Sequence, residues 1–103
     1  MSVLHVAVFK WKPGTTAGAV QSLADALDEL KVQAVGLISY QHGADLGVRD
    51  GTFDYGVVAE FDSAEQIGRY LDHPLHQELV ATYIAPILEE RRAVQIQSAP
   101  WGP

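Results

Sequence analysis

The sequence predicts a single α+β domain in which strands and helices follow one another in the order β-α-β-β-α-β. Three observations support this prediction. Apolar runs rich in β-branched residues alternate with stretches in which apolar residues recur three and four positions apart. Turn residues separate these runs. The length of 103 residues is enough for one modest hydrophobic core and too short for two.

The first half of the chain is typical of a strand, a helix and a second strand. Residues 3–11 form an apolar run that ends at a Pro-Gly turn. Thr15 or Thr16 is placed to cap the next helix, because a threonine oxygen accepts N–H groups of a first helical turn. The apolar residues of this helix keep helical spacing at Val20, Leu23, Leu27 and Leu30. Residues 35–41 predict the second strand.

The second half predicts a third strand followed by two helical segments. Residues 53–61 alternate in the manner of a strand, and Ser63-Ala64-Glu65-Gln66 forms a capping box that opens a helix. Pro74 suits the first turn of another helix. The apolar residues of that helix lie four apart, at Leu75, Leu79, Tyr83 and Ile87. Pro86 lacks a backbone donor, so it should kink or end the helix.

A short last strand at residues 93–97 completes the pattern, and residues 99–103 form a tail. Residues 1–98 therefore make up the domain. The element order is that of a ferredoxin-like fold, in which helices cover one face of a four-stranded antiparallel sheet.

The first strand is apolar on both of its faces. The residues on one face are Leu4, Val6 and Val8, and those on the other are Val3, His5, Ala7, Phe9 and Trp11. Helices cover only one face of the sheet, and soluble monomers rarely expose a large apolar patch. A second copy packed sheet to sheet is the simplest cover, which predicts a symmetric homodimer and a dimeric α+β barrel. We expect the row containing His5 to face the space between the two sheets.

The composition narrows the range of partners. The hydrophobic content of 48% with 19% charged residues is that of an ordinary globular protein. The net charge of −6 argues against nucleic acid and against anionic membrane surfaces, whose phosphates would be repelled. The chain has no cysteine, so disulfides and thiolate metal sites are excluded. No signal peptide or membrane-spanning run is visible, and we expect a cytoplasmic protein.

Four histidines and four tyrosines are the candidate site residues of this sequence. His5 lies in an otherwise apolar strand, where a neutral imidazole donates from one nitrogen and accepts at the other, which suits a proton shuttle. The alternative is a core histidine satisfied by one hydrogen bond. His42, beside a glycine at a strand end, is expected at the surface or at a cavity mouth.

The segment Tyr70-Leu71-Asp72-His73-Pro74-Leu75-His76 brings a phenol and two imidazoles to one helix start. His76 lies beside the apolar stripe and is placed to reach inward, whereas His73 is expected to cap the helix or face solvent. Their spacing of three would also suit a metal on one helical face, but Asp72 is the one obvious further ligand. Tyr70 either packs its ring or donates its hydroxyl to a substrate oxygen in a dry pocket. Tyr40, Tyr55 and Tyr83 are further candidates to line this pocket.

The chain resembles the stress-responsive α/β-barrel domain family of the dimeric α+β barrel superfamily. The matching segments are His5-Val6-Ala7-Val8-Phe9-Lys10-Trp11-Lys12, Asp54-Tyr55-Gly56-Val57-Val58 through Phe61, and Tyr70-Leu71-Asp72-His73-Pro74-Leu75-His76. Some members are plant polyketide cyclases of the olivetolic acid cyclase type. The resemblance implies that His76 is a general base, that Tyr70 holds the substrate and that His5 is a second cavity histidine. Leu27 stands where the cyclase has a further cavity tyrosine.

The resemblance also bears on cofactors. No organic cofactor is expected, and some members hold a magnesium ion through backbone carbonyls, which here would be those near Lys31, Ala34 and Leu37. Hard cations favour such oxygen ligands.

Three functions remain open at this point. The first is a cofactor-free cyclase- or lyase-type enzyme in which His76, with Tyr70 and His5, acts on a small carbonyl or polyketide-like substrate. The second is a non-catalytic stress-response dimer that binds a small apolar or carbonyl-containing ligand. The third is a haem-degrading or monooxygenase-type protein, as found elsewhere in the superfamily.

Overall fold

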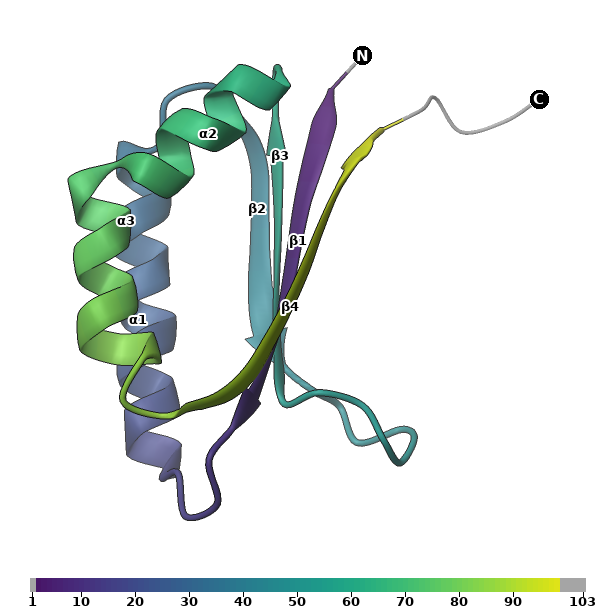
Figure 1. Ribbon diagram of the computed structural model, residues 1–103, viewed down its shortest axis with the longest axis vertical. Coiled ribbons are helices and arrows are strands. Elements are labelled where there is room, and N and C mark those ends of the chain that lie inside the picture. The colour runs from purple at the N-terminus through teal and green to yellow at the C-terminus, as the bar shows by residue number, and fades with distance from the viewer. Residues whose placement is uncertain (1, 99–103) are drawn as a thin grey trace.

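The fold is a four-stranded antiparallel sheet with all of its helices on one face (Figure 1). The computed structural model describes residues 2–98; the predicted tail, residues 99–103, lies outside the described residues. The elements are β1 (Val3–Trp11), α1 (Ala17–Gln33), β2 (Leu37–Ala44), β3 (Tyr55–Phe61), α2 (Ala64–Asp72), α3 (Pro74–Leu79), the π-helical turn η1 (Val80–Ile84) and β4 (Leu88–Gln97). The strand order is β2-β3-β1-β4, which confirms the predicted ferredoxin-like fold.

Side-chain caps begin the three α-helices as their sequences indicate. The Thr16 hydroxyl oxygen accepts the N–H of Ala19 at 3.1 Å, so Thr16 rather than Thr15 is the cap of α1. Ser63 accepts the N–H of Gln66 at 3.4 Å and caps α2. His73 accepts the N–H of Leu75 through Nδ1 at 3.1 Å and thereby caps α3, one of its two predicted roles.

The last strand is twice as long as the sequence suggests. The prediction placed it at residues 93–97, whereas β4 runs from Leu88 to Gln97 and pairs with β1 along that length. Its first half contains Glu89, Glu90, Arg91 and Arg92, which conceal the strand pattern. Charged residues are tolerated there because β4 is an edge strand, and such residues discourage pairing with other chains.

The other strand boundaries shift by two or three residues. The second strand was predicted at residues 35–41 and runs from Leu37 to Ala44, and the third was predicted at 53–61 and begins at Tyr55. The predicted helix through Ile87 ends earlier. It changes at Val80 to a π-helical turn, in which the N–H of Ala85 donates to the Val80 carbonyl at 2.8 Å. Pro86 follows immediately, in keeping with its predicted role in ending the helix.

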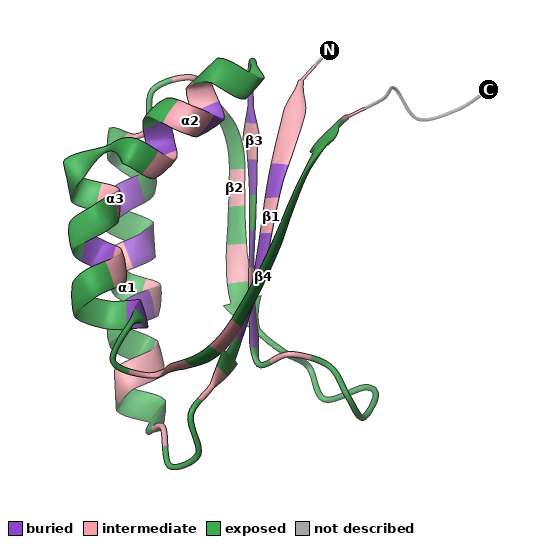
Figure 2. Cartoon of the chain, in the orientation of Figure 1, coloured by how far each residue is buried: buried purple, intermediate pink, exposed green. Residues whose placement is uncertain are grey.

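The prediction for the two sheet faces was wrong in orientation. His5, Ala7 and Phe9 are 3%, 3% and 5% exposed, and they line a cavity together with helix residues, so they face the helices rather than a partner sheet. Figure 2 shows buried positions, in purple, on β1 and β3 and on the helices that cover them. The alternation along a strand shows which residues share a face of the sheet. It does not show which of the two faces the helices cover. The apolar sides of α1 and α2 pack against the row containing His5, because that row continues on β3 through residues such as Val57.

The opposite sheet face is the open one. On it Val6 pairs in register with Val58 of β3 and with Val94 of β4, so that three valines lie side by side across β3, β1 and β4. Val58 and Val94 are 39% and 52% exposed, and Ile96 is exposed as well. Among the described helices, none is both long and apolar enough to cross a membrane.

Candidate active site

A cavity of about 70 Å³ lies between the sheet and the helices. The strands supply one wall and the helices the other, and most of the lining is apolar. The lining residues are His5, Ala7, Phe9, Leu27, Tyr40, Val57, Tyr70, His76, Leu79, Val80, Ile84, Leu88 and Arg91. The three residues proposed from the sequence, His5, Tyr70 and His76, therefore line one cavity, although they come from β1, α2 and α3.

The aromatic rings of these three residues lie close together. The ring centres of Tyr70 and His76 are 4.6 Å apart at an interplanar angle of 60°, an edge-on arrangement. The ring centres of His5 and Tyr70 are 6.5 Å apart. Tyr70 thus lies next to both imidazoles, which suits a shared role around one small bound molecule.

His5 is held in its orientation by the edge strand. Gln95 of β4 pairs in register with His5, and the Gln95 Nε2 lies 2.8 Å from the His5 Nδ1. With the Gln95 amide donating, Nδ1 is the acceptor and the ring proton is on Nε2. Burial, the Arg91 charge and the nearby His76 all lower the pKa of His5 below its usual value. His5 is therefore a neutral hydrogen-bond donor near pH 7.

His76 has the properties expected of a base. Burial is the main cause that lowers the pKa of His76, and the Arg91 guanidinium acts in the same direction. A hydrogen bond to the Leu71 backbone raises the pKa and partly opposes these effects. The net pKa is below the usual 6.5, so the imidazole is neutral near pH 7 and free to accept a proton.

Tyr40 of β2 is a site residue that the sequence left unselected. Its hydroxyl lies 2.8 Å from the hydroxyl of Tyr70, and the two rings meet edge to face. Burial raises the pKa of both phenols, most strongly that of Tyr40, so both stay protonated at neutral pH. The alternation of β2 places Tyr40 on the face that the helices cover. The sequence could not select Tyr40 over Tyr83, because it does not show which face that is. Tyr83 does not line this cavity.

His42 lies in a separate hydrogen-bonded chain between a helix and the sheet. Its Nε2 is 2.7 Å from a carboxylate oxygen of Asp28 in α1, and its Nδ1 is 2.7 Å from the hydroxyl of Tyr55 in β3. The side chain of His42 is only 9% exposed, so it does not lie on the open surface, one of its two expected positions. The hydrogen bond from His42 is the main cause that lowers the pKa of Asp28. Asp28 therefore accepts from Nε2–H, and Tyr55 donates to Nδ1.

Replacing His42 by alanine is expected to destabilise the protein by about 1–3 kcal/mol, because the buried Tyr55 hydroxyl loses its acceptor. The double variant His42→Ala/Tyr55→Phe should lose less free energy of unfolding than the sum of the losses in the two single variants. Urea denaturation of the four proteins measures this coupling. Strictly additive effects would show that the hydrogen bond contributes nothing to stability.

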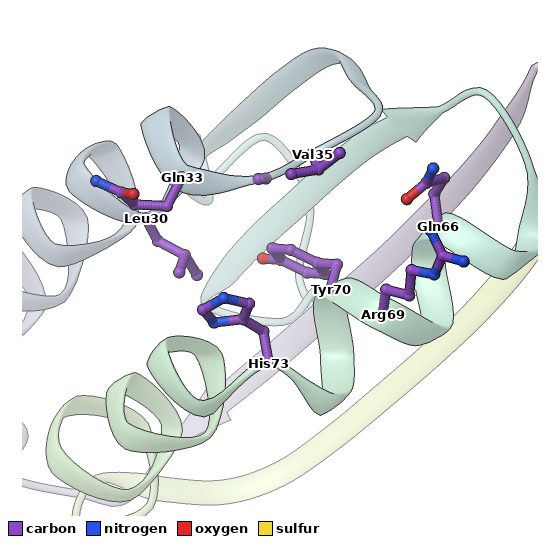
Figure 3. A pocket seen from close by; sticks show the side chains of 8 residues that line it. Leu30, Gln33, Val35, Gln66, Arg69, Tyr70 and His73 are labelled. Carbon is purple, nitrogen blue, oxygen red and sulfur yellow. The ribbon is translucent and has the colours of Figure 1, made fainter.

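His73 and His76 face different cavities. His73 lines a second cavity of about 210 Å³ with residues of α1 and α2, including Leu30 and Gln66 (Figure 3). Tyr70 lines this cavity as well as the first one. The idea that the two histidines share a metal has no geometric support. The described residues contain no cluster of three or more His, Asp or Glu side chains that could hold a metal ion.

The magnesium site at backbone carbonyls stays a prediction. Lys31 and Ala34 lie at the end of α1, and Leu37 begins β2, as the expected site requires. The Lys31 carbonyl oxygen accepts the N–H of Ala34 at 3.4 Å, a long hydrogen bond that leaves a lone pair of this oxygen for a cation.

The fold and cavity define the class of protein as a ferredoxin-like α+β domain with histidines and tyrosines enclosed beneath its helices. The sequence pattern of the stress responsive A/B barrel domain matches residues 3–98. The chain belongs to this family, as its sequence predicted. A search of curated proteins found no match.

Several solved structures share the fold. A dimeric ferredoxin-like protein of unknown function from Thermobifida fusca is 38% identical, with a TM-score of 0.85 and coverage of 93% of this chain and 90% of that one. The protein At3g17210 from Arabidopsis thaliana is 17% identical, with a TM-score of 0.83 and coverage of 98% and 99%. Hydroxynitrile lyase from Passiflora edulis is 18% identical, with a TM-score of 0.80 and coverage of 98% of both chains.

Proposed function

We propose that this protein is a cofactor-free, lyase-type enzyme in which His76 removes a proton next to the carbonyl group of a small substrate. The observation that carries the proposal is the convergence of His5, Tyr70 and His76 on one mostly apolar cavity. A hydroxynitrile lyase with the same fold is consistent with lyase-type chemistry, although its 18% identity supports the fold alone.

The proposed step is a simple proton transfer. The neutral His76 nitrogen takes the α-proton, the electrons of the C–H bond form a carbon–carbon double bond, and negative charge develops on the carbonyl oxygen. In this proposal Tyr70 and His5 donate hydrogen bonds to this oxygen as it becomes an enolate. Tyr40 supports Tyr70 through their 2.8 Å hydroxyl contact. Without a leaving group, the protonated His76 returns the proton to the α-carbon and the carbonyl group re-forms. In the lyase reaction, the enolate electrons instead break the bond between the β-carbon and a leaving group, and the protonated His76 gives its proton to that group.

The size of the cavity limits the substrate. An apolar cavity of about 150 Å³ accommodates benzene, and the cavity here has about half that volume, about 70 Å³. A small carbonyl compound therefore fits better than a polyketide chain. A haem group is far larger than the described cavity, so no observation favours the haem-degrading alternative.

Replacing His76 by alanine is expected to lower proton abstraction by about 10²–10⁴-fold, the usual contribution of a general base. The measurement is the exchange of α-protons of acetone and pentane-2,4-dione for solvent deuterium, followed by NMR. His73→Asn is the matched control, because asparagine keeps the helix cap and His73 faces the other cavity.

The pH dependence gives a second check. The rate should rise with pH and level off above a pKa lower than 6.5, because the pKa of His76 is lowered and only its neutral form accepts a proton. Exchange that is absent in the wild type, together with unfolding of His76→Ala, would instead support a non-catalytic, ligand-binding dimer.

We also propose that the chain forms a homodimer through its open sheet face. Solved structures of the same fold are dimeric, among them the 38% identical relative. The open face carries the apolar row of Val6, Val58 and Val94. A second copy packed on this face would bury a patch that a soluble monomer rarely exposes.

A further inference from the structure

Among residues 2–98, Arg91 is the one charged residue that lines the candidate active-site cavity. It pairs in register with Phe9 of β1, and its neighbours two and four residues along β4, Ala93 and Gln95, pair with Ala7 and His5. Paired and alternate residues share a face of the sheet, so Arg91 lies on the cavity side. The residue is exposed overall, which places its guanidinium at the solvent end of the cavity.

The carboxylates closest to Arg91 in sequence are engaged elsewhere. Glu90 forms an ion pair with Arg92 at 2.6 Å, and Glu89 forms one with Lys10 at 3.4 Å. Within residues 2–98 no carboxylate lies within 4 Å of the Arg91 guanidinium, in a protein of net charge −6. No Asp or Glu lines the cavity either.

The charge at the solvent end of the cavity is consequently positive. Arg91 acts on both imidazoles, since its charge contributes to the lowered pKa of His5 and of His76. A guanidinium presents paired donors that match the two oxygens of a carboxylate. An anionic ligand would compensate the unpaired charge, and the apolar interior would receive its uncharged end.

We propose that the substrate is a short oxo-carboxylate, held by Arg91 through its carboxylate while its carbonyl group enters the cavity toward Tyr70 and His76. The carbon between the two groups then lies near His76, where the neighbouring ketone makes its proton acidic. The small volume of about 70 Å³ favours the shortest chain that contains both groups and the carbon between them, which has four carbons. This inference rests on the proposed function and names the class of substrate for the same site.

The test compares two probes of nearly the same shape, acetoacetate and its neutral amide acetoacetamide. NMR titration at low ionic strength measures the affinity of each, and the methyl signals of Val57, Leu79 and Ile84 report binding in the cavity. The wild type should bind acetoacetate roughly five- to tenfold more tightly than acetoacetamide, and Arg91→Gln should bind both equally. Arg92→Gln is the matched control, because it removes the same charge from a neighbouring residue already paired with Glu90.

Three results would overturn the assignment of Arg91. One is equal binding of the two probes by the wild type. Another is an equal loss of preference in Arg91→Gln and Arg92→Gln, which would indicate a long-range field only. The third is dissociation of the Arg91→Gln dimer in size-exclusion chromatography, which would place the residue in the subunit interface.

The outcome also separates this inference from the proposed function. If acetoacetate binding depends on Arg91 but the deuterium exchange of α-protons does not depend on His76, the cavity is an anion-binding site and the proposed enzyme activity is rejected. Exchange in pentane-2,4-dione that depends on His76, with no effect of Arg91 on acetoacetate binding, would keep the enzyme and reject the substrate class.

Discussion

Replacing Val6 by aspartate is expected to convert the dimer to monomers, with an increase of roughly a thousandfold or more in the dissociation constant. Val6 lies at the centre of the open sheet face, flanked by Val58 and Val94 in register. A symmetric interface would contain the new carboxylate twice, unpaired and away from water. Burying such charges costs several kcal/mol, and about 4 kcal/mol corresponds to a thousandfold change.

Sedimentation velocity over a range of protein concentrations measures this effect. The control is Val48→Asp, which introduces the same charge at a loop valine that is 68% exposed. We expect Val48→Asp to stay dimeric. The Val6 variant should keep its circular dichroism spectrum, because the open face contributes nothing to the core beneath the helices. A Val6→Asp dimer as tight as the wild type would show that the copies meet on another surface.

Replacing Gly36 by alanine is expected to destabilise the protein by about 2–4 kcal/mol. Gly36 connects α1 to β2 and has a φ angle of 79°, a conformation that costs other residues about 1 kcal/mol or more. An added Cβ would also lie 2.8 Å from Cγ and 2.9 Å from Cδ of Gln66. Atoms this close force the Gln66 side chain, α2 or the turn to move, so a steric cost adds to the backbone strain.

Gly51 provides a matched control for this experiment. It has the same φ angle of 79°, and an added Cβ there would meet no atom within 4 Å. Gly51→Ala should therefore cost only the backbone strain of about 1 kcal/mol. The double variant Gly36→Ala/Gln66→Ala should recover part of the free energy of unfolding that Gly36→Ala loses, because the contact with Gln66 is removed. Urea denaturation measures the free energy of unfolding of the wild type, the two single glycine variants and the double variant. Equal losses in Gly36→Ala and Gly51→Ala would show that the contact with Gln66 costs nothing.

Much of the fold could be predicted from the sequence, because its local signals agree with one another. The threonine and serine caps, Pro74 at a helix start and the alternation of apolar residues each act over a few positions. The extent of β4 could not be predicted, since its charged first half is stabilised by pairing with β1 rather than by apolar alternation.

The candidate site was predicted in part. His5, Tyr70 and His76 were identified from residue type, position and family resemblance, and the structure brings them to one cavity. Gln95 and Arg91 were missed because their roles depend on strand register across a long separation in sequence. Gln95 is recognisable only beside His5, and Arg91 only beside Phe9.

The sequence by itself determined the element order, the family and the absence of cysteine chemistry, and it predicted three of the candidate-site residues. Only the tertiary structure decided which sheet face the helices cover. The row containing His5 was expected to face a partner sheet, and it faces the helices instead. The physical reason is that pleating sorts residues into two faces by local geometry. Which face becomes the core depends on the packing of distant helices, which no local pattern specifies.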